Sequence, residues 1–335
     1  MSKRRSKNER LLQTVNLSKH FAINDGFFSR EKQTLQAVDR VNLDVYKGET
    51  LGIVGESGSG KTTLAHLIMN LYEPTSGKVV FDGVQLNELS KRKLRQKRKD
   101  IQMIFQDPFS SLNPRLTVFD IISEPLLTHE KLKGTALEKE VYRLLELVGL
   151  DRTYAKRYPH EFSGGERQRV GIARAVALQP KLIVCDEPIS ALDVSIQSQI
   201  LNLLKQLQRT LNLTYIFIGH DLPAVKYISD RVAVMYLGRI VEEASKKALF
   251  KQPLHPYTAG LMASVPITHP SLRKNDQKDI LSGDPPSPVN PPSGCHFHTR
   301  CPYATDKCLV DDPRLEEKRP GHYAACHYPL IKNNV

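Results

Sequence analysis

The sequence predicts an α/β fold built around a parallel β-sheet. Aliphatic runs without internal charge occupy residues 50–54, 182–185 and 215–218, and segments with helical patterns lie between them. Continuous apolar strands that alternate with helices are typical of a parallel sheet covered on both faces. A chain of 335 residues with 40% hydrophobic residues is also long and apolar enough for a large buried core.

The amino-terminal part of the chain favours strands. Residues 38–43 alternate between apolar and polar types, which is the period of a half-buried strand, and a polar insertion lies at residues 24–33. Residues 50–54 predict a buried strand that enters a glycine-rich turn. Residues 61–71 then predict a helix. The apolar residues of that helix are Leu64, Leu67, Ile68 and Leu71.

The middle of the chain predicts further helices. Residues 91–99 are strongly basic, which indicates a solvated helix face or, alternatively, an anion site. Residues 101–105 form a short apolar segment, and residues 118–150 have a mostly helical pattern. Beyond residue 253, prolines and then cysteines become frequent, which predicts a separate, loop-rich extension.

The charge balance limits the class of partner. Lysine and arginine exceed aspartate and glutamate by 48 to 36, a net charge of +12, which suggests nucleotide, nucleic acid or membrane headgroups. We find no apolar run near the roughly 20 residues that cross a bilayer. The basic residues 1–10 are not followed by the apolar stretch of a signal peptide, so we expect a cytoplasmic chain.

A phosphate-binding loop is the first chemical motif. Residues 55–62 read GESGSGKT and match GxxxxGK[ST] between a predicted strand and a predicted helix. Successive backbone N–H groups of such a loop surround phosphate oxygens; Lys61 is expected at the β and γ phosphates, and the Thr62 hydroxyl on Mg²⁺. The predicted nucleotide-binding residues of this segment are Gly55, Glu56, Ser57, Gly58, Ser59, Gly60, Lys61, Thr62 and Thr63.

Two further motifs carry chemistry. Asp186 and Glu187 follow the apolar run 182–185, where α/β sheets bind ligands, so we expect Asp186 at Mg²⁺ and Glu187 at the attacking water. Residues 163–165 read Ser-Gly-Gly at a predicted helix start, which exposes free N–H groups and predicts a second anion site. A single nucleotide on one chain has no evident need for two phosphate sites.

The second anion motif resembles the signature loop of ATP-binding cassette (ABC) ATPases, where the loop of one subunit caps the γ-phosphate held by another. Phe162 and Glu166 replace the first and last residues of the usual LSGGQ pattern, while Ser163, Gly164 and Gly165 keep its core. The resemblance implies ATP hydrolysis in a dimer of cassettes. It also implies that Glu166 belongs to the nucleotide-binding set.

Other positions resemble the same family one by one. Gln106 is similar to the glutamine that senses Mg²⁺ and water, and His220 is similar to the switch histidine at the γ-phosphate. Residues 190–193 resemble the loop that crosses the dimer interface, and Phe21 falls where an aromatic ring stacks on adenine. The catalytic set that the resemblance implies is Glu187, His220, Gln106 and Lys61.

The family also implies an architecture. We expect a P-loop NTPase with a RecA-like parallel core sheet, an antiparallel β subdomain and a helical signature subdomain at about residues 107–165. The nucleotide-binding domain would cover residues 1–252 and the extension residues 253–335.

Three strings favour one branch of the family. Residues 185–197, 105–114 and 255–258 resemble the oligopeptide and dipeptide permease ATPases, and Ser190 with residues 193–195 is similar to the F-type oligopeptide subunit. The resemblance implies a D-type cassette partner, two membrane permeases and an extracellular peptide-binding protein. It places the chain on the cytoplasmic face of the cell membrane, with oligopeptides as cargo and no nucleic acid partner.

Four cysteines near the carboxyl end predict one shared site. They are Cys295, Cys301, Cys308 and Cys326. Their spacing matches neither zinc-ribbon pairs nor ferredoxins, and four thiolates suit either zinc or a [4Fe–4S] cluster. Resemblance to the permease family favours the cluster, with zinc and unligated thiols as alternatives. Spare candidate ligands are His296, His298, His322 and His327, and Cys185 is expected to be a buried strand residue.

Other functional classes stay open at this point. A dipeptide or nickel importer has a closely similar ATPase. A nucleic-acid-associated ABC ATPase could use residues 91–99 on phosphates, but the long coiled-coil insertion or second cassette typical of that class is missing. In a non-catalytic, metal-sensing subunit the cysteine tail would be the functional module, but the presence of Glu187 and His220 argues against it.

Overall fold

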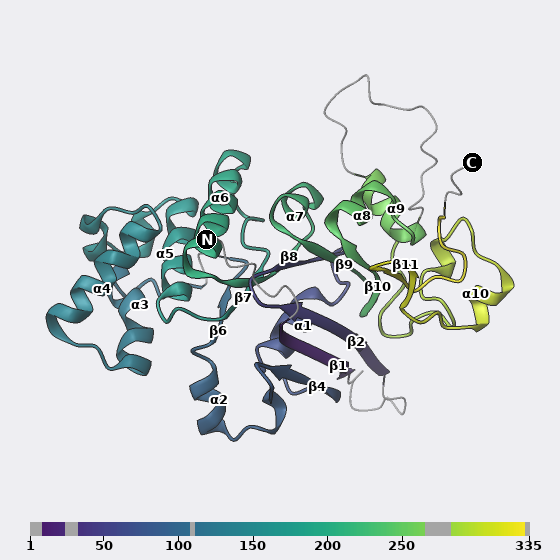
Figure 1. Ribbon diagram of the computed structural model, residues 1–335, viewed down its shortest axis with the longest axis horizontal. Coiled ribbons are helices and arrows are strands. Elements are labelled where there is room, and N and C mark those ends of the chain that lie inside the picture. The colour runs from purple at the N-terminus through teal and green to yellow at the C-terminus, as the bar shows by residue number, and fades with distance from the viewer. Residues whose placement is uncertain (1–8, 24–32, 108–110, 265–282, 332–335) are drawn as a thin grey trace, which may run out of the picture. The chain divides into compact units, whose positions relative to one another are not determined.

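The computed structural model describes residues 9–23, 33–107, 111–264 and 283–331 (Figure 1). These residues form two compact units. The first unit is drawn from the described parts of residues 1–11, 45–50 and 88–219, and the second unit is drawn from residues 12–44, 51–87 and 220–335. The predicted polar insertion at residues 24–33 lies almost wholly outside the described residues.

Parallel strands form the centre of the first unit. β6 (Ile101–Ile104) pairs with β7 (Leu182–Asp186), and β7 pairs with β8 (Thr214–Gly219). Every residue of β7 and β8 is buried, and Cys185 lies between Ile104 and Phe217 in the register. The predicted strands are therefore confirmed, and Cys185 is the buried strand residue that the sequence predicts.

Helices account for much of the first unit. They are α2 (Lys91–Lys97), α3 (Val118–Pro125), α4 (Gly134–Leu147), α5 (Gly164–Val176) and α6 (Val194–Leu211), with a π-helical turn at Leu126–Glu130 and 3₁₀ turns at Arg152–Lys156 and Pro159–Glu161. α3 and α4 both contact α5. The predicted segment 118–150 is divided because Pro125 cannot donate an intrahelical hydrogen bond and Lys131 adopts a left-handed φ of 57°.

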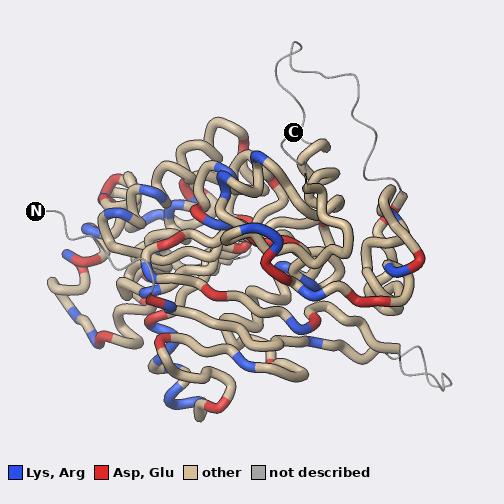
Figure 2. Tube along the Cα trace, turned by 45° about the vertical axis from the view of Figure 1, so that its right-hand side comes forward, with Lys and Arg blue, Asp and Glu red and all other residues tan. Residues whose placement is uncertain are grey.

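Helix α2 carries most of the basic residues predicted at 91–99, and it has the exposure expected of a solvated face. None of the residues of α2 is buried, and Ser90 caps its first turn by accepting from Lys93 N–H. Figure 2 shows basic and acidic residues interspersed along the described trace. The short apolar segment that follows becomes β6, so the helix faces solvent while the strand supplies core.

An antiparallel sheet lies largely in the second unit. It has the order β2 (Gln33–Tyr46), β1 (Arg10–Ile23), β4 (Ser76–Phe81) and β5 (Val84–Gln85). β1 and β4 pair from Leu12 opposite Phe81 onward. The alternation predicted over residues 38–43 holds from Arg40 to Leu43, where Arg40 and Asn42 are exposed and Val41 and Leu43 are buried. It is wrong at Asp39, which is buried beside Val38, because Arg40 has a left-handed φ of 50° that interrupts the strand period. This is the antiparallel subdomain that the sequence predicts.

The second unit also contains a mixed set of strands. β3 (Thr50–Val54) runs parallel to β9 (Arg231–Tyr236), and β9 pairs antiparallel with β10 (Arg239–Ser245). The order continues from β10 to β12 (His322–Ala324) and β11 (Glu316–Arg319). The helices of this unit are α1 (Lys61–Ile68), α7 (Leu222–Ile228), α8 (Lys246–Lys251), α9 (Pro256–Ala263) and α10 (Asp306–Val310), with a 3₁₀ turn at His298–Arg300.

The carboxyl-terminal extension is joined to the core sheet through a strand. β12 pairs with β10, with Ala324 opposite Glu242 and His322 opposite Ala244. The sequence predicts a separate, loop-rich extension without these strands, because β11 and β12 are short and polar and lack a hydrophobic alternation. Among the residues that the structure describes, no helix is both long and apolar enough to cross a bilayer.

Candidate functional site

The predicted phosphate loop connects β3 to α1 in the second unit. Gly60, immediately before the helix, has a left-handed φ of 101°, and a Cβ there would lie 2.1 Å from the carbonyl oxygen of Ala37. A Cβ on Gly55 would lie 2.2 Å from the carbonyl oxygen of Met235. Both positions therefore require glycine, because any side chain would collide with fixed backbone. The loop is held closely against its neighbours.

Lys61 points back over this loop. Its Nζ donates to the carbonyl oxygens of Gly55 and Glu56, each at 2.8 Å, and the residue is only 5% exposed. Ser57, Gly58 and Thr62 are exposed on the same segment. The loop thus offers exposed backbone and a hydroxyl beside a buried ammonium group, the chemistry that a polyphosphate requires.

Phe21 lies in a small aromatic cluster of the second unit. Its ring meets Tyr72 edge to face with centroids 5.7 Å apart, and Lys19 Nζ lies 5.1 Å from the Phe21 centroid. Tyr72 is 40% exposed and contacts His66, which belongs to α1. The sequence pattern indicates Phe21 alone. Tyr72 is an exposed ring next to Phe21, on the chain segment that follows the phosphate-loop helix.

The first unit brings Gln106 and Glu187 together. Gln106 Nε2 donates to Glu187 Oε2 at 3.0 Å, and Asp186 at the end of β7 is 2% exposed. Glu187 has a left-handed φ of 46°, and its N–H donates to the carbonyl of Ile218 on β8 at 3.0 Å. Left-handed backbone is costly for a residue with a side chain and is concentrated at functional sites.

The Ser-Gly-Gly segment begins α5 as predicted. Glu166 Oε2 accepts from Ser163 N–H at 2.9 Å and from its hydroxyl at 2.7 Å, while Glu166 N–H donates to Ser163 Oγ. The hydrogen bonds from Ser163 lower the pKa of the Glu166 carboxyl. A Cβ on Gly165 would lie 2.6 Å from Ile196 Cγ2, so α5 packs closely on α6 there. The carboxylate of Glu166 therefore caps its own helix.

The predicted nucleotide residues are divided between the two units. Gln106, Asp186, Glu187 and residues 163–166 belong to the first unit, whereas Phe21, residues 55–63 and His220 belong to the second. His220 is exposed and follows Gly219, the last residue of β8, directly in the chain.

The four predicted cysteines line one small cavity of the second unit, together with His298 and His327. All four are free thiols. Burial raises the pKa of Cys295 to about 11 and that of Cys326 to about 12, and it also raises the pKa of Cys301. His296 and His322 do not line this cavity; instead, His322 Nε2 contacts Glu242 Oε1 at 2.6 Å.

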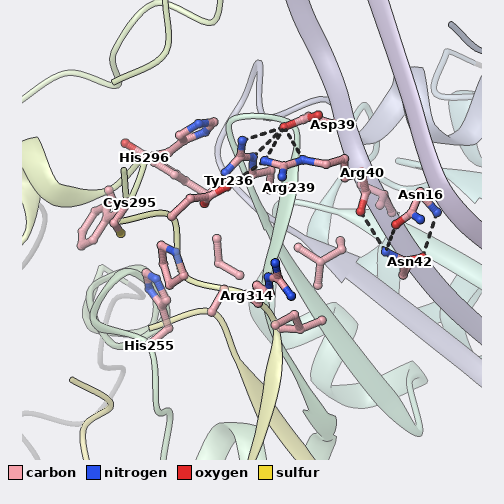
Figure 3. Close-up of a pocket in the computed structure, with 18 residues that line it drawn as sticks. Asn16, Asp39, Arg40, Asn42, Tyr236, Arg239, His255, Cys295, His296 and Arg314 are labelled. Atoms are coloured by element: carbon pink, nitrogen blue, oxygen red, sulfur yellow. Dashed lines mark hydrogen bonds and ion pairs between the residues drawn. The ribbon is translucent and has the colours of Figure 1, made fainter. Parts of the chain in front are cut away.

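A larger cavity of about 580 Å³ lies in the same unit (Figure 3). Arg239 contacts Asp39 at 2.7 Å, and Arg40 contacts Asp312 at 2.7 Å, so the acidic groups in its wall are paired with arginines. Burial alone would raise the pKa of Asp39, but the two arginines together lower it. No residue of the phosphate loop lines this cavity.

Two family models match two successive segments of the chain. Residues 38–190 match the family model of the ABC transporter, and residues 241–308 match that of the oligopeptide/dipeptide transporter C-terminal region. The oligopeptide transport ATP-binding protein AppF of Bacillus subtilis is 51% identical over 95% of this chain and 97% of its own length. The chain belongs to the ABC transporter ATP-binding proteins.

Other relatives agree with this membership. The oligopeptide transport ATP-binding protein OppF of Escherichia coli is 53% identical over 91% of this chain and 92% of its own length. The ABC cassette MJ0796, solved as a dimer in a post-hydrolysis state with ADP and Pi, is 30% identical, with a TM-score of 0.63 over 70% of this chain and 99% of that one. The predicted family and its cassette fold are confirmed.

The metal part of the sequence prediction is not supported for this ABC protein. Although the four cysteines line one cavity, no group of three or more His, Cys, Asp or Glu side chains within the described ranges is arranged to hold a metal ion. The donor chemistry fits a thiolate site, because four thiols surround one space, but the arrangement is not that of a ligand group.

The structure adds two residues that sequence reasoning misses. Arg300 and Tyr257, both in the extension, contact Glu56 of the phosphate loop. Tyr257 falls in the string 255–258 that resembles the permease family, but nothing in that pattern indicates its contact. Arg300 lies in no motif, and 244 residues separate it from its partner.

Proposed function

We propose that this chain is the ATP-hydrolysing subunit of an ABC importer that energises the uptake of oligopeptides across the cell membrane. One structural observation supports this proposal in addition to the family match. A carboxylate at the end of a buried strand, Glu187, is held by Gln106 at 3.0 Å in a chain that also has a complete phosphate loop. These are the parts needed to bind a triphosphate and to orient water for attack on it.

The residues divide the work of the reaction. The loop N–H groups of residues 55–62 and the Lys61 ammonium hold the phosphates, and Phe21 stacks on the base. Glu187 accepts the proton of the attacking water, while Gln106 fixes the carboxylate orientation. His220 donates to the γ-phosphate. Charge matters most for the Lys61 ammonium, which attracts the phosphates, and for the Glu187 carboxylate, which accepts a proton.

Magnesium fits the oxygen donors that are present. The Thr62 hydroxyl and the Asp186 carboxylate are hard ligands of the kind that Mg²⁺ prefers, and Gln106 supplies an amide oxygen. Bound there, the ion would neutralise phosphate charge. Asp186 is 2% exposed, so its carboxylate is fixed by the strand rather than by solvent.

The signature segment is proposed to act on a nucleotide held by a second cassette. Ser163 begins a helix of 13 residues, and the N–H groups of its first turn point out of the helix end, where anions bind favourably. The solved relative MJ0796 is a dimer with ADP and Pi. We propose a dimer of cassettes here too, which closes around ATP and has a D-type cassette as the second subunit.

Transport requires further proteins. Two membrane permeases and an extracellular peptide-binding protein complete the proposed importer, with this chain on the cytoplasmic face and without a nucleic acid partner. The relatives AppF and OppF carry the name of oligopeptide transport, which supports this cargo. We propose a boundary at residue 252 between the nucleotide-binding domain and the extension.

The cysteine cavity keeps its proposed role as a [4Fe–4S] site, with zinc as the alternative. Four thiols that line one space support the proposal, although their arrangement is not that of a ligand group. If the cluster is present, the purified native complex should be brown, absorb at about 400 nm and contain about four iron and about four sulfide per chain. Zinc without iron would refute the cluster.

Substitution of Glu187 tests the catalytic proposal. Glu187→Gln keeps the side-chain shape but cannot accept a proton, so ATP turnover in the assembled transporter should fall by about 10²- to 10⁴-fold while ATP still binds. The partner cassette is silenced in this assay. Glu130→Gln, an exposed glutamate of the same unit, is the matched control. Unchanged turnover of Glu187→Gln would remove this residue from the role of base.

A further inference from the structure

Glu56 in the phosphate loop is held from two sides by the carboxyl-terminal extension. Arg300 forms a two-point ion pair with its carboxylate, Nη1 to Oε2 at 2.8 Å and Nη2 to Oε1 at 3.1 Å. Tyr257 Oη accepts from the backbone N–H of Glu56 at 2.9 Å. The extension therefore contacts both the side chain and the main chain of one loop residue.

Arg300 is itself fixed by its surroundings. It is 7% exposed and ends the 3₁₀ turn His298–Arg300, and its guanidinium carbon lies 6.0 Å from the Tyr236 ring centroid. The hydrogen bonds to Glu56 raise the pKa of Arg300. Paired planar groups of this kind are strong and directional, particularly when they are shielded from water.

A buried aromatic cluster supports the contact with Tyr257. The rings of Tyr236 and Tyr257 have centroids 4.5 Å apart, and Phe297 lies 5.4 Å from the first and 5.5 Å from the second. All three are at most 1% exposed. Tyr257 thus presents its hydroxyl to the loop from a rigid support, which fixes the Glu56 backbone in place.

One hydrogen bond links Glu56, which Arg300 and Tyr257 hold, to the phosphate-binding ammonium of Lys61. The carbonyl oxygen of Glu56 accepts from Lys61 Nζ at 2.8 Å, so the position of Glu56 helps to set the position of the Lys61 ammonium. The charge of Arg300 should also favour ATP binding. An unpaired carboxylate at Glu56 would repel a polyphosphate, and the paired guanidinium neutralises it.

We propose that Arg300, supported by Tyr257, is a positioning residue that clamps the phosphate loop through Glu56 and thereby sets the affinity of the chain for ATP. This inference rests on the proposed function of residues 55–62 as the ATP loop. Neither residue touches the nucleotide in the proposal. The extension acts as part of the nucleotide site by holding the loop from behind.

Equilibrium binding of a fluorescent trinitrophenyl-ATP to the full-length chain tests the clamp. Arg300→Gln should raise the Kd about tenfold, because it leaves the Glu56 carboxylate unpaired beside the phosphates. Glu56→Gln should raise the Kd only about twofold, and the double variant should bind like Glu56→Gln, since removing both charges removes the repulsion. Arg314→Gln, an exposed arginine of the same extension, is the matched control and should bind like the parent chain.

Several results would overturn the clamp. Arg300→Gln with the same Kd as Arg314→Gln would do so, as would a double variant whose loss is the sum of the two single losses. Lys61→Ala separates this failure from failure of the proposed function. If Lys61→Ala does not weaken binding, the ATP loop assignment itself falls; if it weakens binding and Arg300→Gln does not, only the clamp falls.

A kinetic comparison distinguishes positioning from loss of folded protein. In the assembled transporter, Arg300→Gln should raise the KM for ATP about tenfold and leave kcat within about twofold. Reduced kcat with an unchanged KM would instead indicate a smaller folded fraction and would overturn the proposal. Should Arg300→Gln fail to fold, Arg300→Lys keeps the charge and one contact; its KM should rise about threefold, and an unchanged KM would overturn the clamp.

Discussion

A buried carboxylate on β10 ties the extension to the core, and its removal should destabilise the protein strongly. Glu242 is 0% exposed and accepts three hydrogen bonds. The donors are Leu254 N–H at 2.7 Å, His255 N–H at 2.9 Å and His322 Nε2 at 2.6 Å. Two of these groups begin the extension and the third lies on β12, so one side chain holds both ends of the segment.

The magnitude follows from the groups that would be left unpaired. Each buried donor left without an acceptor costs about 1–3 kcal/mol. Glu242→Ala removes the acceptor for three donors in a region that water reaches poorly. We therefore expect a loss of about 4 kcal/mol in the free energy of unfolding and, for a chain of 335 residues, a fall in Tm of about 6 °C.

Thermal and urea unfolding, followed by circular dichroism on the full chain, would measure this loss. Glu242→Gln keeps one acceptor oxygen and should lose about half as much as Glu242→Ala. Glu73→Ala, an exposed glutamate of the same unit, should change the stability by less than about 0.5 kcal/mol. If Glu242→Ala is no less stable than Glu73→Ala, the three hydrogen bonds do not anchor the extension and the reasoning fails.

Three further predictions follow from local geometry. Burial lowers the pKa of His255 from 6.5 to about 4, so the unfolded chain binds more protons than the folded chain between these pH values. The free energy of unfolding should therefore be highest above about pH 6.5 and should fall by up to about 3 kcal/mol toward pH 4. His255→Asn can still accept from Tyr257 N–H and should reduce this pH dependence in acid unfolding. Gly55→Ala should lower the free energy of unfolding by about 1–3 kcal/mol and weaken ATP binding, because its Cβ would collide with the backbone of Met235. Gly58→Ala has open space around its Cβ but a φ of 77°, and it should lower the free energy of unfolding by about 1 kcal/mol. If the two variants show the same fall in Tm and the same rise in Kd for ATP, the steric argument is wrong. Glu166→Gln should preserve the cap on Ser163 and leave Tm nearly unchanged, while Glu166→Ala should cost about 1 kcal/mol; equal unfolding midpoints for the two variants would show that the cap contributes nothing.

The parts of the fold that the sequence predicts well are those with a local signal. β7 and β8 are continuous apolar runs, and the phosphate loop has a fixed glycine spacing, so each can be recognised within a few residues. β11 and β12 carry polar residues, and their strand conformation depends on pairing with β10 rather than on their own composition. No local pattern can report such a strand.

The same distinction explains the predicted and the missed parts of the site. Lys61 and Glu187 belong to short motifs, because the chemistry of phosphate binding needs several groups close together in one turn. Arg300 acts through a contact with Glu56 that is 244 residues away in sequence, and a single arginine has no pattern of its own. Its role is visible only once the chain is folded. The extension supplies two of the contacts that hold Glu56. The segment that matches the oligopeptide/dipeptide transporter C-terminal region and the loop proposed to bind phosphate should therefore be treated as one functional site, and substitutions at Arg300 should change ATP affinity through Glu56.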